Sequence, residues 1–443
     1  MGRRLPGPRG PAATLGTTAG FATRPHHTLL GLRDRYGPVV EFGIGPGRLV
    51  AVFGAEACAF VFGHDEHFSN HEMFESVAPL SGDTALLLSD GEPHRRRRRI
   101  AATGFTRRSI AGYVPAFTGN ADRVIDGWRP GDRVDLHQEF RTVIRRATLE
   151  VLFGPDLAGD ADRIGAMLGP LLAFVDGDAV LQQLRRAFRA RAWRDALAGR
   201  AEVDRIVRAE LHRRSSDAPR PDLLGRLATP VDGVQLTETE LLDQVVSTVV
   251  AGYETTSAAM AWMCLTVLGA PAIRDRALAE VLTTCGDAPP THDDLPRLPF
   301  LDQIVHETLR LYPPASISGR YVRRGFTVAG HDIRPGTRLL FSPLVTHRDP
   351  EIWDRATTFL PQRWDAGRPG FRRPGPGEFL PFGGGAHRCL GAALAVAELT
   401  VLLARLVVRA ELEPVPAPVR PAGFLAMRPV HGVPVRVRSV RPR

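Results

Sequence analysis

The sequence predicts one mainly helical domain with small β-sheets, of the α+β class. Through most of the 443-residue chain, apolar residues recur every three or four positions, the period of an amphipathic helix. Alternating, strand-like stretches are short and lie near residues 39–44, 49–53, 320–333 and the C-terminus. No internal repeat or interdomain linker appears, so we expect residues 1–25 to form a flexible Gly/Pro/Arg-rich N-terminus and residues 26–443 a single domain.

The helical pattern predicts seven helices, of which one is much longer than the others. They span residues 95–104, 142–153, 201–213, 238–268, 272–284, 301–312 and 390–409. At the start of the longest, 238–268, Thr237 and Glu240 have the spacing of a capping box. Its centre, residues 251–257, contains a glycine and clustered hydroxyls, which are poor helix formers. A buried helix weakened at its centre indicates a functional site there.

The composition excludes several classes of function. The net charge is +9, yet the basic side chains are all arginine, so Schiff-base lysines, P-loops and protein kinases are excluded. The arginines are scattered without interleaved aromatic residues, so no nucleic-acid partner is expected; only the run at residues 95–99 indicates a basic patch for an acidic partner. The four cysteines form no CxxC pair, which favours a reducing compartment, and the N-terminus lacks the apolar run of a signal peptide or membrane anchor. We therefore expect a cytoplasmic protein.

The strongest local pattern is FGGGAHRCLG at residues 382–391. The glycines permit a tight turn close to a flat ligand, and Gly391 leaves room beyond the sulfur of Cys389. Cys389 precedes a predicted helix, whose N-terminus favours an anionic thiolate. The alternatives are a glycine turn beside an inert cysteine and a phosphate loop, which would lack its lysine.

In this segment the chain resembles the cytochrome P-450 superfamily of haem-thiolate monooxygenases, whose fingerprint is FxxGxxxCxG. Phe382, Gly385, Cys389 and Gly391 match it, and His387 fills the Arg/His position two residues before the cysteine. The resemblance implies a cytochrome P-450 fold of the soluble bacterial, actinobacterial type. It also implies haem b held between the long distal helix and the cysteine loop, with Cys389 as the iron ligand and His387 on a haem propionate. A thiolate ligand favours O–O cleavage.

Other motifs follow in the order of the family. Glu307 and Arg310 form an ExxR pair on one helix face, and Arg363 lies in the later segment FLPQRW. The resemblance implies that these three residues form a buried triad that supports the haem loop and takes no part in the chemistry.

The weakened centre of the 238–268 helix matches the family pattern (A/G)Gx(D/E)T. The resemblance implies that Ala251 and Gly252 open a groove for O2 and that Glu254 and Thr255 deliver protons to it. The alternative is a threonine-rich buried helix whose hydroxyls only bond to its own carbonyls.

Basic residues upstream and downstream match the family's propionate contacts: His94, Arg98 and Arg320. Of the remaining arginines in the dense run, we expect Arg95, Arg96 and Arg99 to dock an acidic ferredoxin. No flavin or nicotinamide domain is recognisable, so electrons are expected from a separate ferredoxin and ferredoxin reductase. The His-Arg-Asp triplet at 347–349 resembles a kinase motif but lacks its companions, and the glycines at 43–47 fit a hairpin turn.

The expected reaction is hydroxylation of a small lipophilic molecule by O2, such as a terpenoid, fatty acid, steroid or macrolide. The resemblance places an apolar set in the pocket: Phe74, Val77, Leu80, Ile317, Phe424, Leu425 and Met427. Two other functions stay open. A peroxide-driven peroxygenase or isomerase would need no redox partner, and a haem-binding sensor would need no proton relay.

Overall fold

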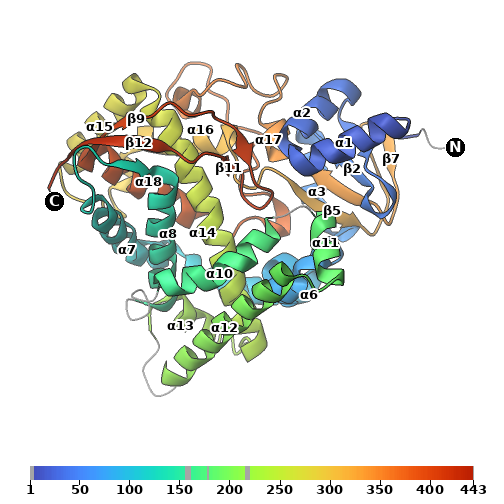
Figure 1. Cartoon of the computed structure of the whole chain (residues 1–443), viewed down its shortest axis with the longest axis horizontal. Helices are drawn as coiled ribbons and strands as arrows, with labels where there is room; N and C mark the ends of the chain where they lie inside the picture. Colours follow the sequence, from blue (N-terminus) through green and yellow to red (C-terminus); the bar gives the residue numbers. More distant parts are fainter. Residues whose placement is uncertain (1–3, 155–160, 177–178, 215–219, 443) are drawn as a thin grey trace.

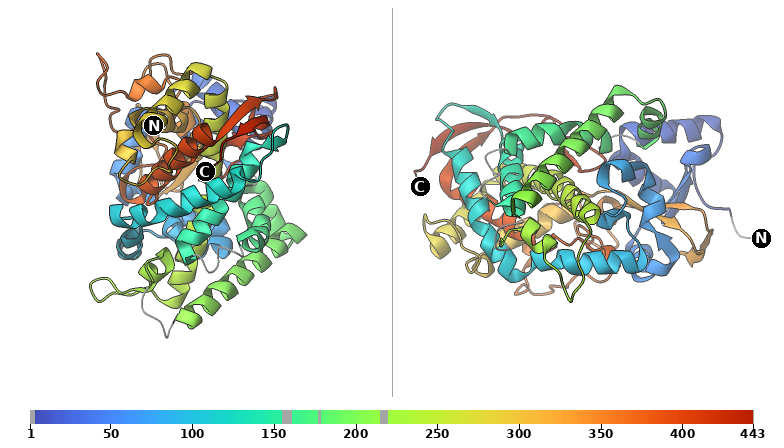
Figure 2. Two further views of the ribbon diagram at one scale, coloured as in Figure 1. Left: turned by 90° about the vertical axis from the view of Figure 1, so that its left-hand side faces the viewer. Right: turned by 90° about the horizontal axis from the view of Figure 1, so that it is seen from below.

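The structure is a computed structural model that describes residues 4–154, 161–176, 179–214 and 220–442. It confirms a mainly helical fold with small sheets (Figure 1). The N- and C-terminal ends lie at opposite ends of the longest dimension, and the largest sheet lies toward the N-terminal end (Figures 1 and 2). The long helix α14 (Glu238–Leu268) crosses the middle of the molecule.

The helices account for most of the chain. The α-helices are α1 (Pro11–Thr23), α2 (Pro25–Tyr36), α3 (Ala55–Gly63), α4 (Asn70–Phe74), α5 (Ala78–Ser81), α6 (Gly91–Ala102), α7 (Arg107–Ile125), α8 (Leu136–Phe153), α10 (Ala161–Val175), α11 (Ala179–Ala187), α12 (Arg191–Arg214), α13 (Leu223–Ala228), α14 (Glu238–Leu268), α15 (Pro271–Cys285), α16 (Pro299–Leu311), α17 (Pro343–Thr346) and α18 (Ala392–Arg409). The 3-10 turns are η1 (Gly45–Gly47), η2 (Asp65–His67), η3 (Glu75–Val77), η4 (Leu86–Leu88), η5 (Thr103–Phe105), η6 (Leu295–Arg297), η7 (Pro361–Trp364) and η8 (Gly385–His387).

The strands form one five-stranded sheet and three smaller ones. They are β1 (Val39–Phe42), β2 (Leu49–Val52), β3 (Phe68–Ser69), β4 (Arg133–Asp135), β5 (Ser318–Val322), β6 (Phe326–Val328), β7 (His331–Ile333), β8 (Arg338–Phe341), β9 (Ala410–Pro414), β10 (Pro421–Ala422), β11 (Arg428–Pro429) and β12 (Pro434–Val440). The largest sheet has the order β1-β2-β8-β5-β3, in which only β2 and β8 run parallel. The others are β4-β12-β9 and the hairpins β6-β7 and β10-β11.

The helix α14 begins and ends at the predicted residues. Thr237 and Glu240 form the predicted capping box: the Thr237 hydroxyl accepts from the Glu240 N–H, and the Glu240 carboxylate accepts from the Thr237 N–H. Most of α14 is buried, because α8, α16 and α18 pack around it. Such packing stabilises a helix whose centre has poor intrinsic propensity.

Several helices were not predicted. Both α7 and α10 carry an internal proline, Pro115 and Pro170, which interrupts the expected helical pattern. Burial of the apolar face of α7 in the core overrides this local preference.

Part of the segment that was expected to be flexible is a helix. Residues 11–23 form α1, and its Phe21 packs edge-on against Phe42 of β1 with ring centroids 5.1 Å apart. The same ring lies 5.9 Å from that of Phe424 near the C-terminus. The apolar contact explains the order of this segment, while the domain boundary at residue 26 stays a prediction.

The described helices differ in length and hydropathy. No single one is both long and apolar enough to cross a membrane, although α14 and α15, bent by 107°, pass as a pair.

Candidate functional site

Cys389 lies in the short connection between η8 and α18. Its backbone N–H donates to the Phe382 carbonyl at 2.8 Å, which closes the glycine loop. Gly385 has a φ of +62°, and a Cβ atom there would lie 2.2 Å from the carbonyl oxygen of Phe62 on α3. Glycine is therefore required at this position by the turn and by the approach of α3, whereas the sequence suggested approach to a ligand.

The Cys389 thiol differs from the other cysteines in its accessibility. Cys58 and Cys264 are fully buried, whereas the side chain of Cys389 is accessible although protein surrounds much of it. Burial raises the pKa of the Cys389 thiol, and the Gly391 N–H and the charges of Arg98 and Arg388 act in the opposite direction. The protein alone thus favours the protonated thiol. A coordinated cation deprotonates such a thiol outright.

Four basic side chains gather beside the cysteine loop, as the sequence predicted. The rings of His94 and His387 lie 4.1 Å apart, and Arg98 donates to the Arg388 carbonyl at 2.6 Å. Burial lowers the pKa of His387 to about 3, and the neighbouring His94, Arg320 and Arg98 act in the same direction. The cluster joins α6, β5 and η8 in one wall, whose positive charge comes from Arg98 and Arg320.

The two arginines of the wall have no carboxylate in direct contact. Arg98 donates to the Arg388 carbonyl, and Arg320, only 6% exposed, donates to the carbonyl of Gly319. Within the described ranges, no carboxylate lies within 4 Å of either guanidinium group. A buried charge without a partner is costly, so the buried Arg320 in particular suits a ligand with carboxylates, as haem has in its propionates.

Two residues that sequence reasoning missed support this wall. The Asn70 amide lies 2.9 Å from Nδ1 of His387. Asp90, which precedes α6, accepts from the Ser69 hydroxyl at 2.5 Å and from the Asn70 N–H at 2.9 Å. The Asp90 carboxylate also lies 3.8 Å from Nε2 of His387. No sequence motif marked Asn70, and the Asp90 side chain makes no capping hydrogen bond to α6.

The centre of α14 exposes a short strip in an otherwise buried helix. Ala251 is exposed and Gly252 and Thr255 are half-buried, while their neighbours from Tyr253 to Glu254 are buried. A Cβ atom on Gly252 would meet no atom within 4 Å. The strip therefore borders open space, and the groove for O2 stays a prediction.

The two residues predicted to relay protons are both engaged elsewhere. The Thr255 hydroxyl donates to the Ala251 carbonyl at 2.6 Å. The Glu254 carboxylate accepts from Arg141 of α8 at 2.5 and 3.2 Å. The guanidinium group of Arg141 also lies 5.1 Å from the Tyr253 ring centroid. The helix thus satisfies the hydroxyl internally, the alternative considered from the sequence, and the proton relay stays a prediction.

Glu307, Arg310 and Arg363 meet as predicted. Glu307 and Arg310 are fully buried and share two hydrogen bonds of 2.8 Å, and Nε of Arg363 lies 3.5 Å from the same carboxylate. Glu307 also accepts from the Trp364 indole at 2.9 Å. The pair therefore holds the segment 355–364 against α16.

His347, from the triplet that resembles a kinase motif, belongs to the same framework. Its Nδ1 lies 2.9 Å from the Arg310 carbonyl, and its Nε2 accepts from the Leu380 N–H at 2.7 Å. Burial lowers its pKa to about 3. The neutral ring links the Glu307–Arg310 pair to the residues just before the cysteine loop.

The residues predicted to line a pocket divide into two groups. Phe74, Ile317, Phe424 and Leu425 are partly exposed. The other three, Val77, Leu80 and Met427, are at most 8% exposed and pack within apolar clusters or against their neighbours. Those three side chains present little free surface to a ligand, and their place in the pocket stays a prediction. Leu87, 48% exposed beside α14, was not predicted.

The loop that carries Leu87 is fixed to α14 by polar contacts. The Asp243 carboxylate accepts from the hydroxyl and N–H of Thr84 at 2.6 and 3.0 Å and from Arg200 at 2.6 Å. The Gln244 side chain bonds to the Leu86 N–H and the Thr84 carbonyl. These contacts hold one wall of the groove in place.

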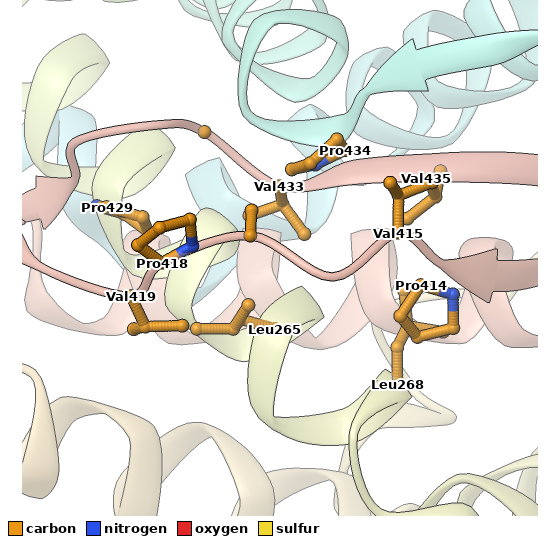
Figure 3. A pocket seen from close by; sticks show the side chains of 12 residues that line it. Leu265, Leu268, Pro414, Val415, Pro418, Val419, Pro429, Val433, Pro434 and Val435 are labelled. Atoms are coloured by element: carbon orange, nitrogen blue, oxygen red, sulfur yellow. The ribbon is translucent and has the colours of Figure 1, made fainter.

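A small apolar cavity lies away from this site. It is lined by the C-terminal end of α14 and by the β9–β12 region, including Leu265, Leu268 and Val419 (Figure 3). Its volume of about 30 Å³ is far below the roughly 300–1,000 Å³ of typical ligand pockets. It is therefore not a candidate for substrate binding.

The arginine run is only partly available to a partner. Arg96 pairs with Glu240 at the start of α14, and Arg97 donates to the same carboxylate at 2.8 Å. Arg95 pairs with the exposed Glu92 at 2.9 Å, and Arg99 is exposed. Arg96 therefore joins α6 to α14, and its part in docking a partner stays a prediction.

Comparisons with known proteins agree with this geometry. The family model described as Cytochrome P450 matches residues 5–429. Cytochrome P450 139 of Mycobacterium tuberculosis is 43% identical over 94% of this chain and 98% of its own length. Cyclooctat-9-en-7-ol 5-monooxygenase of Streptomyces melanosporofaciens is 31% identical (92% of this chain, 89% of its own). Pentalenene oxygenase of Streptomyces avermitilis is 29% identical over 90% of each chain.

The fold comparison gives the same result. A solved structure of retinoic acid bound cyanobacterial CYP120A1 superposes with a TM-score of 0.89, covering 99% of this chain and all of the other, at 23% identity. The chain belongs to the cytochrome P450 family and is an oxidoreductase of the monooxygenase type. The family binds haem b through a cysteine thiolate, and the accessible thiol and the unpaired cationic wall fit that group.

Proposed function

We propose that this protein hydroxylates a cyclic terpenoid, using O2 and electrons from a ferredoxin and ferredoxin reductase. The observation that carries the proposal is the combination of one accessible thiol, Cys389, with a buried cationic wall and an exposed strip on α14. None of the three features alone would indicate an oxygenase.

Cys389 would bind the haem iron, and His94, Arg98, Arg320 and His387 would bind its propionates. When bound through a thiolate, haem supplies the activation of O2. The wall residues hold the group by charge-assisted hydrogen bonds, which are the stronger kind in a buried setting.

Thr255 and Glu254 would control protons on the α14 side. The Thr255 hydroxyl can donate toward the groove only after it leaves the Ala251 carbonyl, 2.6 Å away. Glu254 can receive a proton from solvent only when its carboxylate leaves Arg141. Both bonds are local and can be exchanged by side-chain rotation.

Electron transfer would take place on the surface beside the cysteine loop. Arg99 and Arg388 are exposed, and Arg388 is adjacent to Cys389 in sequence. Exposed arginines attract an acidic partner over about 10 Å at moderate salt, and this attraction is screened as salt rises. Charge reversal of Arg99 should therefore slow reduction, while the same change at Arg420, which directly precedes β10, should not.

The substrate class rests on the relatives and on the apolar groove. Two relatives are named for oxidation of cyclooctat-9-en-7-ol and pentalenene. The partly exposed side chains Phe74, Ile317 and Leu425 are apolar, which favours a ligand without charge.

The test uses the purified, haem-loaded protein. Pentalenene and other cyclic terpenes should shift the haem spectrum from low to high spin, and a surrogate ferredoxin and reductase should give a hydroxylated product. Turnover with hydrogen peroxide alone, at equal rate, would favour the peroxygenase. Haem binding without turnover under either condition would favour a sensor.

A further inference from the structure

Asp176 directly follows α10, and its carboxylate holds the tip of the β10–β11 hairpin. Oδ1 accepts from the backbone N–H groups of Phe424 and Leu425 at 2.9 and 2.7 Å. Oδ2 accepts from the Arg428 guanidinium at 2.8 Å. One side chain thus satisfies two successive N–H groups of the tip and its nearest cation.

The other end of the same tip is fixed independently. The Met427 N–H donates to the Pro314 carbonyl at 2.9 Å, and the Met427 carbonyl accepts from the Trp262 indole at 2.8 Å. Both Met427 and Trp262 are 1% exposed. This end is therefore part of the core built on α14 and the segment after α16.

The end of the tip that Asp176 contacts is more exposed to solvent than the Met427 end. The side chains of Asp176 and Arg428 are 19% and 33% exposed, so water reaches both charges. Exposure weakens an ion pair, whereas hydrogen bonds from N–H groups to a carboxylate retain their direction. Among the described residues, every hydrogen bond between the end of α10 and this tip involves Asp176.

We propose that Asp176 is a positioning residue: it places Phe424 and Leu425 against the substrate and makes their position depend on α10. The proposal rests on the proposed function and on the sequence prediction that these two residues line the pocket. With the bonds intact, the tip is held between α10 and the core. When they break, Met427 stays in place, while the backbone of Phe424 and Leu425 loses its hydrogen bonds to α10 and only side-chain packing, such as that of Phe424 on Phe21, remains.

The consequence is a preference that depends on ligand size. A bulky ligand that reaches the tip should dissociate faster when the hydrogen bonds from the tip to Asp176 are absent. A small ligand at the haem iron should not sense the change. The pair of probes is imidazole, which is small, and clotrimazole, which is bulky; both bind haem iron through a nitrogen atom.

The experiment measures dissociation of each probe from the haem-loaded protein by stopped-flow absorbance. Because hydrogen bonds to a charged group are strong, Asp176→Ala should speed clotrimazole release about tenfold and imidazole release less than about twofold. Asp176→Asn keeps one acceptor oxygen but no charge, and Arg428→Gln keeps both N–H bonds. Each of these two variants should speed clotrimazole release by a smaller factor, of about threefold. They provide the test if the alanine variant does not fold.

The matched control is Asp332→Ala, which removes the carboxylate that accepts from Thr327 in the β6–β7 hairpin. It should leave the release of both probes unchanged. Equal acceleration of imidazole and clotrimazole by Asp176→Ala would mean general loosening and would overturn the proposal, as would no acceleration of either. Wild-type protein without a thiolate-ligated haem spectrum would instead overturn the proposed function on which this role depends.

Discussion

Nη2 of Arg141 on α8 lies 2.5 Å from Oε1 of Glu254 on α14. Glu254 directly precedes Thr255, the other residue predicted to deliver protons to O2. The arginine therefore holds the acid on the side of α14 that packs against α8, while Thr255 faces the open strip. Two adjacent residues of one helix are thus separated by the directions of their side chains, and movement of Arg141 would be needed to connect them.

Glu254→Gln should slow product formation while leaving haem content unchanged, because the amide keeps the shape of the side chain but cannot carry a proton. Arg141→Gln should also change the rate, since it removes the competitor for the acid. The measurement is the solvent deuterium isotope effect on turnover. An isotope effect that is identical in wild type and both variants would contradict a role for this pair.

Thr255→Ala should divert reducing equivalents to hydrogen peroxide, because no hydroxyl remains to donate a proton in the groove. Thr255→Ser retains the hydroxyl and should remain coupled. The ratio of product to NAD(P)H consumed separates the two outcomes. Equal coupling in the alanine and serine variants would exclude the hydroxyl from proton delivery.

Cys389→Ser should abolish the red-shifted Soret band that thiolate ligation gives to the ferrous–CO complex. Cys285→Ser is the control, since Cys285 lies half-buried at the end of α15. Loss of the band in the control, or its survival in Cys389→Ser, would contradict the assignment of the iron ligand.

Arg310→Met should destabilise the protein by about 3–5 kcal/mol, because it leaves the carboxylate of Glu307 buried without its main partner. Arg274→Met removes an exposed ion pair with Asp275 and should cost less than about 1 kcal/mol. Urea unfolding of the haem-loaded variants gives both values. If the two substitutions cost the same, the buried pair has no special role in stability.

Stability should fall as the pH falls from about 6.5 toward 3, in part because His347 stays neutral in the fold. Burial lowers its pKa to about 3 from the ordinary histidine value of about 6.5, so in this window the unfolded state binds the proton and is stabilised relative to the folded state. The contribution should be about 1.4 kcal/mol per pH unit within that window. The slope of unfolding free energy against pH should be shallower in His347→Gln, and an unchanged slope would show that this histidine does not titrate on unfolding.

The sequence predicted the fold class, the bounds of α14 and the meeting of Glu307, Arg310 and Arg363, because each depends on a local pattern or a family motif. It did not predict the partners of Glu254 or His387. Arg141 lies 113 residues before Glu254, and Asn70 lies 317 residues before His387. Neither Arg141 nor Asn70 belongs to a motif. Such contacts depend on how helices pack, which periodicity along the chain does not encode.

The same distinction explains the pocket residues. Leu80 and Leu425 are both apolar and both lie in segments that the family uses for substrates. Only the packing decides that Leu80 is fully buried while Leu425 is partly exposed. Apolar character predicts burial without telling core from ligand contact.

Glu240 has a consequence for where the protein can move. Its carboxylate binds Arg96 and Arg97 of α6 as well as the start of α14. The helix α6, which carries His94 and Arg98, is therefore linked by ion pairs to α14, which carries Thr255. These two helices would flank a bound haem, so we expect a substrate to enter past parts that are attached by fewer contacts, of which the hairpin tip beside Asp176 is one.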